Sequence, residues 1–119
     1  MITPRQTVTA TIEEAGVVAV IRLQQPDRVR AVIDALADGG VRALEVTMTV
    51  PGATELIRGL SSTLSSDFLL GAGTVLDPQT AARVIDAGAR FVVSLPLEPS
   101  PALAADAYRV EPPRPKEPR

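Results

Sequence analysis

The chain has 119 residues, of which 45% are apolar, and this predicts a single domain with a buried core. The net charge is −2 and only 3% of the residues are aromatic, which argues against a nucleic-acid partner. The sequence contains no cysteine and no histidine, so it excludes disulfides, thiolate nucleophiles, Ser-His-Asp triads and most zinc sites. No apolar run approaches the roughly 18 residues that span a bilayer, and we expect a cytoplasmic protein without a membrane partner.

Predicted helices and strands alternate along the chain. A first helix is predicted over residues 7–15, before Gly16. Short runs rich in β-branched residues, typical of strands buried on both faces, follow at nearly regular intervals, over residues 17–22, 41–47, 68–71 and 91–94. Apolar residues at helical spacing predict helices over residues 27–38, 53–60, 78–87 and 99–108. Asp77 and Pro78 are typical of an N-cap and a first helical position, and Gly88 is typical of a helix end.

This alternation predicts an α/β fold made of β/α units, whose right-handed crossovers make the sheet parallel. Four units are half of a (β/α)8 TIM barrel, which typically needs about 250 residues. An open sheet with helices on both faces is the alternative. We expect residues 1–109 to form the half barrel. Residues 110–119 are rich in proline and charge, and we expect a disordered tail there.

Glu45 is unusual because it stands in an otherwise apolar strand. An ionised carboxylate in such a position is costly unless another group holds it or the protein uses it. Near the carboxyl end of a parallel strand it would lie where α/β enzymes keep their chemistry. The structural alternatives are an exposed edge position or an ion pair with Arg22 or Arg42. Gly71-Ala72-Gly73-Thr74-Val75 ends the next strand, and its structural alternative is close packing of the strand on a helix.

Four ordered segments resemble the 2-keto-3-deoxy-6-phosphogluconate (KDPG) and 4-hydroxy-2-oxoglutarate aldolases. The resemblance covers roughly residues 7–108. The segments are Val18-Ala19-Val20-Ile21-Arg22, Gly39-Gly40-Val41-Arg42-Ala43-Leu44-Glu45-Val46-Thr47, Gly71-Ala72-Gly73-Thr74-Val75-Leu76 and Gly88-Ala89-Arg90-Phe91-Val92-Val93-Ser94.

The resemblance implies a (β/α)8 barrel, usually a homotrimer, that acts as a class I aldolase without a cofactor or metal. Such an enzyme cleaves its keto-acid substrate to pyruvate plus glyceraldehyde 3-phosphate or glyoxylate, through a Schiff base on a lysine. By position in the motif, Glu45 is the catalytic proton shuttle. It would take the proton of the C4 hydroxyl and later protonate the enamine at carbon, both of which suit a carboxylate with a raised pKa.

The resemblance also implies substrate-binding residues. Thr74 corresponds to the residue that contacts the carboxylate region of the keto acid, and Gly73 belongs to the same motif. Arg22 ends the first strand at the expected barrel mouth, where it would hold an anion or else be a solvated charge. Thr49 stands where many members carry a carboxylate-binding arginine, and its alternative role is that of a strand-forming residue.

The chain departs from the family pattern in two further places. The fourth strand ends in Ser94-Leu95-Pro96-Leu97, where the family usually has Ser-Pro-Gly. The Schiff-base lysine of the family belongs to the sixth strand and the phosphate site to the seventh and eighth, whereas the only lysine here is Lys116. We therefore expect a truncated N-terminal half with little or no activity alone. The alternative is a non-catalytic half barrel that self-associates or complements a separate second half.

Overall fold

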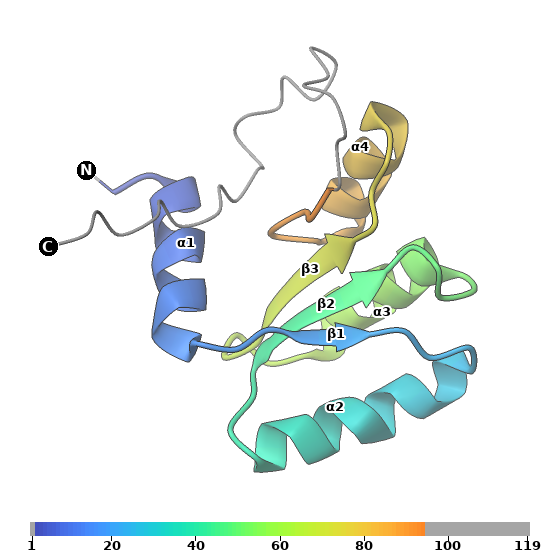
Figure 1. Cartoon of the computed structure of the whole chain (residues 1–119), viewed down its shortest axis with the longest axis horizontal. Helices are drawn as coiled ribbons and strands as arrows, with labels where there is room; N and C mark the ends of the chain where they lie inside the picture. The colour runs from blue at the N-terminus through green and yellow to red at the C-terminus, as the bar shows by residue number, and fades with distance from the viewer. Residues whose placement is uncertain (1, 95–119) are drawn as a thin grey trace, which may run out of the picture.

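The computed structural model describes residues 2–94, and the predicted last helix, proline-rich tail and Lys116 lie outside this range. Helices and strands alternate as predicted (Figure 1). They are α1 (Pro4–Ala15), β1 (Ala19–Ile21), the 3-10 turn η1 (Pro26–Arg28), α2 (Val29–Asp38), β2 (Ala43–Thr47), α3 (Ala53–Thr63), β3 (Leu69–Gly73) and α4 (Pro78–Ala87).

The strands form a parallel sheet in the order β1-β2-β3. Val20 pairs with Glu45, and Glu45 pairs with Gly71, so these three residues share one face of the sheet. The predicted fourth strand is reduced to one parallel bridge between Ala72 and Val92. Backbone hydrogen bonds of 2.8–3.2 Å still hold residues 90–93 along β3. The described residues are therefore an α/β fragment consistent with part of a barrel.

One face of the sheet packs against α2, α3 and α4, which lie together on that side in Figure 1. The strands contribute alternate residues such as Leu44, Val46 and Ala72 to this core, as period-two side chains must. Each helix contributes the residues that fall on its apolar face, among them Ile33, Ile57 and Val84. Because Leu44 and Val46 face this core, Glu45 lies on the opposite face of the sheet.

The opposite face, here called the Glu45 face, is covered at its amino-terminal end by α1. Val8 of α1 forms a second small core with Ala43, Leu69 and Phe91. In Figure 1, α1 stands beside the beginnings of the strands, away from their arrowheads. The carboxyl-terminal part of this face therefore remains available for polar residues.

The helix ends follow local sequence signals. Asp77 caps α4, with its carboxylate accepting a 2.7 Å hydrogen bond from the backbone N–H of Thr80, as predicted. Gly88 ends α4 at φ 118°, a backbone conformation that favours glycine. Helix α1 begins earlier than predicted, because Thr3 and Gln6 form a reciprocal capping box ahead of Thr7.

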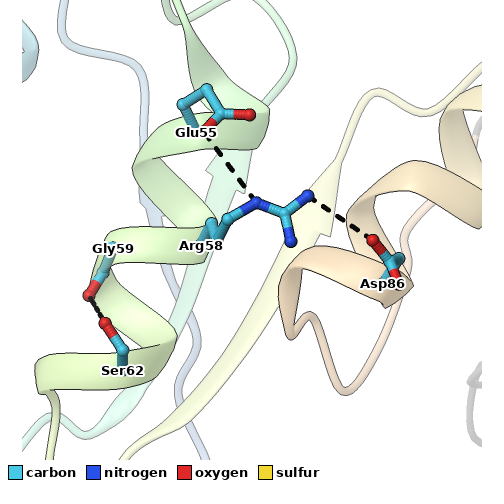
Figure 2. A network of polar contacts seen from close by, with 5 residues as sticks. All are labelled: Glu55, Arg58, Gly59, Ser62 and Asp86. Carbon is cyan, nitrogen blue, oxygen red and sulfur yellow. Dashed lines mark hydrogen bonds and ion pairs between the residues drawn. The ribbon is translucent and has the colours of Figure 1, made fainter.

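One exposed ion pair, Arg58–Asp86, connects α3 with α4, and a second, Arg58–Glu55, lies within α3. Figure 2 shows Arg58 extending from α3 between Glu55 and Asp86, at 3.8 Å and 3.5 Å. The side chain of Asp86 is 80% exposed although it is paired. No helix within residues 2–94 has the length and apolar character needed to cross a membrane.

Candidate functional site

Glu45 lies at the centre of β2, two residues before the carboxyl end at which it was expected. Its side chain compensates for this offset by extending toward the end of β3. A Cβ atom placed on Gly73 would lie 2.5 Å from the Glu45 carboxyl carbon and would overlap Oε1. The carboxylate therefore rests on the backbone of the last residue of β3.

Burial controls the ionisation of Glu45. Glu45 is only 8% exposed. Removal of water raises the pKa of its carboxyl group above the ordinary 4.5, while the positive charge of Arg22 acts in the opposite direction and lowers it. A carboxyl group with a raised pKa holds its proton more readily, which suits a group that both accepts and returns protons.

Arg22 follows β1 directly and is exposed. It and Glu45 reach the site from adjacent strands of one sheet. Its charge acts on Glu45 through space, and no ion pair between the two is recorded in the described part of the chain. The exposed guanidinium is placed where it can meet an anion from solvent at this end of the sheet.

Thr49 lies in the turn after β2, with its hydroxyl 2.6 Å from the hydroxyl of Thr47. Thr47 is fully buried on the Glu45 face, where it pairs in register with Gly73. Its hydroxyl also makes a long 3.5 Å contact to the carbonyl of Ile21. The spacing of two residues between Glu45 and Thr47 is the sequence signal that places both side chains on one face of the sheet.

Thr74 follows Gly73 immediately and is half-buried. Its backbone has φ 56°, the only positive φ of a non-glycine residue within the described range. Such a conformation is a true outlier for a β-branched residue, and these outliers cluster at functional sites. The sequence carried no signal for it, since the position is not glycine or asparagine.

The predicted site residues thus gather at one end of the sheet. Arg22, Thr49 and Thr74 follow the ends of three neighbouring strands, and Glu45 and Gly73 meet between β2 and β3. Among residues 2–94, no three acidic side chains come close enough together to hold a metal ion.

A separate hollow of about 320 Å³ opens at the other end of the sheet, where β2 and β3 begin. Its charged lining residues are exposed, and none of the predicted site residues lines it. Its lining is Thr11, Glu14, Ala15, Gly40, Arg42, Ala43, Asp67 and Leu69. The buried carboxylate makes the Glu45 end the stronger candidate for chemistry.

Sequence comparison finds relatives that are aldolases. The chain is 41% identical over 78 residues to the KHG/KDPG aldolase of Escherichia coli K12, a match covering 66% of this chain and 36% of that protein. It is 42% identical over 81 residues to the 2-dehydro-3-deoxy-phosphogluconate aldolase of Pseudomonas aeruginosa, covering 68% of this chain and 36% of that protein. The matched segment therefore spans little more than a third of these relatives.

Structure comparison and a family model agree with these matches. A Legionella pneumophila KDPG aldolase, solved with pyruvate captured as a covalent carbinolamine, has a TM-score of 0.69 and 34% identity, covering 87% of this chain and 47% of that one. A Zymomonas mobilis 2-keto-3-deoxy-6-phospho-gluconate aldolase has a TM-score of 0.73 and 28% identity, covering 87% and 50%. The model for KDPG and KHG aldolases matches residues 8–111. The chain therefore belongs to the KDPG and KHG aldolase family.

Proposed function

We propose that this chain supplies the proton-transfer half of a class I aldolase that cleaves 2-keto-3-deoxy-6-phosphogluconate or 4-hydroxy-2-oxoglutarate. The observation that carries the proposal is the buried Glu45 carboxylate, seated on Gly73 at the carboxyl end of a parallel sheet. Membership of the aldolase family supplies the reaction type. The products would be pyruvate and an aldehyde, either glyceraldehyde 3-phosphate or glyoxylate.

In this reaction a lysine amine condenses with the C2 carbonyl of the keto acid and releases water. The C3–C4 bond then breaks, and its electron pair becomes the C2–C3 double bond of an enamine as the iminium electron pair moves to nitrogen. Glu45 accepts the proton of the C4 hydroxyl as the aldehyde forms, and it later returns a proton to C3. Water then hydrolyses the imine, which releases pyruvate and the free lysine amine. Thr74 and Arg22 would hold the anionic end of the keto acid, and Thr49 would complete the polar rim.

The nucleophile has to come from elsewhere, because residues 2–94 contain no lysine and Lys116 lies in the proline-rich tail. A solvated lysine keeps a pKa near 10.4 and is a poor nucleophile at neutral pH. We propose that the complete site forms when β/α units equivalent to the second half of the relatives close against the Glu45 face. By family resemblance, the working assembly would be a homotrimer of barrels in the cytoplasm.

Borohydride trapping with pyruvate tests this proposal. The 119-residue chain alone should give no adduct by mass spectrometry. An adduct on Lys116 would refute the claim that this chain lacks the nucleophile. Mixing the chain with the C-terminal half of the E. coli KHG/KDPG aldolase should give an adduct on a lysine of that half. The C-terminal half alone is the control, and a mixture that traps no more than this control would count against the proposal.

Deuterium exchange at the methyl group of pyruvate tests the role of Glu45 in the same mixture. Exchange requires proton transfer at C3, and general acid–base groups contribute about 100-fold or more. Glu45→Gln should therefore slow exchange by about 100-fold while leaving borohydride trapping in place. An unchanged exchange rate would assign the proton step to another group.

A second candidate function is that of a non-catalytic half barrel, which self-associates or complements a separate second half. The observation in its favour is exposed apolar surface on the Glu45 face. Val20 is 49% and Val93 is 37% exposed there, and within residues 2–94 strand β1 pairs only with β2. This candidate predicts association without trapping or exchange.

A further inference from the structure

Strand β3 presents glycine at two successive positions of the Glu45 face. Gly71 pairs in register with Glu45, and Gly73 pairs with Thr47. Neither glycine has the positive φ that favours glycine, since the positive values in the described range belong to other residues. Glycine inside a strand weakens it, and its usual purpose there is a close approach by another group. These positions therefore need glycine for the space above the strand that a side chain would fill, and not for its backbone conformation.

Two different groups use the space over β3. The ring of Phe91 lies over Gly71, and a Cβ atom on Gly71 would overlap it. The carboxyl group of Glu45 lies over Gly73, where a Cβ atom would overlap Oε1 and stand 2.9 Å from Cγ. The aromatic ring thus comes from residues 90–93 on one side of β3, and the carboxylate comes from β2 on the other side.

We propose that Gly73 is a positioning residue, whose missing side chain forms the seat that holds the Glu45 carboxylate across β3 beside Thr74. This inference rests on the proposed role of Glu45 in proton transfer. It adds the reason why a glutamate from the centre of β2 reaches the end of the neighbouring strand. With any side chain at position 73, the carboxylate would have to lift away from the sheet toward solvent.

The burial pattern around Glu45 agrees with such a seat. Val20 is the register partner of Glu45 on β1 and is 49% exposed, although it is apolar. Glu45 is 8% exposed, although it is charged when ionised. The β1 neighbour of Glu45 is therefore open to solvent, whereas the Glu45 carboxyl group packs on the backbone of Gly73 on β3. Loss of water at this seat also explains why the pKa of Glu45 is raised.

Substitution of Gly73 by alanine in the 119-residue chain tests the seat directly. Carboxyl carbon NMR against pH should show Glu45 titrating above its ordinary pKa of 4.5, with the Glu45→Gln variant assigning its signal. In Gly73→Ala the titration of Glu45 should move back toward that ordinary value. Gly59→Ala is the matched control, because a Cβ atom at this helical glycine meets nothing within 4 Å. An unmoved Glu45 titration in Gly73→Ala would overturn the proposal.

A double-mutant cycle keeps the test decisive if Gly73→Ala folds poorly. Glu45→Ala vacates the seat, so Gly73→Ala should lower the melting temperature in the wild-type background and much less in the Glu45→Ala background. An equal loss in both backgrounds would show that glycine is needed for another reason. The NMR titration and the melting temperature both report on Glu45 without requiring catalysis. A failure of deuterium exchange would therefore refute the proposed function and leave the seat intact.

Discussion

Thr74 combines a β-branched side chain with a left-handed backbone, at φ 56°. A non-glycine residue held in this region costs about 1–3 kcal/mol, and the surrounding structure must repay that cost. Thr74 stands at the end of a strand, beside the seat of a buried carboxylate. Strain is expected at such a position when function rather than stability selects the residue.

Replacing Thr74 by glycine should therefore stabilise the chain by about 1 kcal/mol, because glycine adopts positive φ freely. Urea denaturation would measure the change. Thr74→Ala is the matched control, since it removes the hydroxyl but retains an unfavourable backbone conformation. If Thr74→Gly is no more stable than Thr74→Ala, the left-handed backbone at position 74 carries no cost, and the prediction is wrong.

The stability of the fold should depend on pH through Glu45. The pKa of this group is raised in the folded chain, so the folded state holds the proton more strongly than the unfolded state. Its contribution is fully present below the unfolded value of 4.5 and is lost as the pH rises through the folded pKa.

Glu45→Gln removes this titration. The stability of the variant relative to wild type should therefore increase as the pH rises across that window and then level off. Chemical denaturation at a series of pH values would measure the difference, with Glu55→Gln on the exposed surface of α3 as the control. A difference that shrinks as the pH rises would contradict the burial of the carboxylate.

At the scale of the elements, apolar packing and one ion pair, Arg58–Asp86, both link α3 to α4. Arg58 pairs with Glu55 and Asp86, but all three side chains are 49–80% exposed (Figure 2). The neighbouring Ile57 is fully buried in the core that contains Val84 of α4. Exposed pairs contribute about 0–1 kcal/mol, whereas truncating a buried isoleucine costs about 2–5 kcal/mol.

Adjacent residues of α3 thus allow a direct comparison. Ile57→Ala should lower the free energy of unfolding by about 3 kcal/mol, and Arg58→Ala by no more than about 0.5 kcal/mol. Thermal and urea unfolding at low and high salt would measure both changes. A loss in Arg58→Ala that matches Ile57→Ala and disappears in salt would show that the ion pairs hold the helices together.

The elements were predictable where local signals agree with the tertiary structure. Asp77 and Gly88 mark both ends of α4 in the sequence, and the structure places the caps there. Helix α1 begins ahead of the predicted residue 7 because Thr3 and Gln6, which have the spacing of a capping box, cap it there. The extension of β3 through Gly73 was missed because glycine is depleted in strands, and pairing with β2 overrides that preference.

The candidate site was predictable only in part, for a related reason. Position in a parallel strand brings Glu45, Arg22 and Thr74 to one end of the sheet, and this follows from the order of the elements. The seat of Glu45 on Gly73 depends on the register between β2 and β3, which no local pattern contains. The left-handed backbone of Thr74 is likewise imposed by its surroundings and contradicts local propensity.

At the scale of the whole molecule, the Glu45 face combines buried and exposed apolar residues. If this face associates with a second copy, Val20→Ser should weaken self-association by roughly tenfold, since burying a valine side chain contributes about 1.5 kcal/mol. Sedimentation velocity over a range of concentrations would measure it. Ile2→Ser is the control, because Ile2 is 74% exposed and precedes α1. A wild-type chain that stays monomeric at every concentration would argue against self-association.

Strands β2 and β3 each pair with the strand that precedes them in the chain. Proteins are synthesised from the N-terminus, and contacts between segments near in sequence form quickly. As β2 leaves the ribosome, β1 is already available to receive it, and β2 is then available to β3. Within residues 2–94, neither β2 nor β3 has to wait for a strand made later before it can pair. The order in which these units can dock is the order in which translation delivers them.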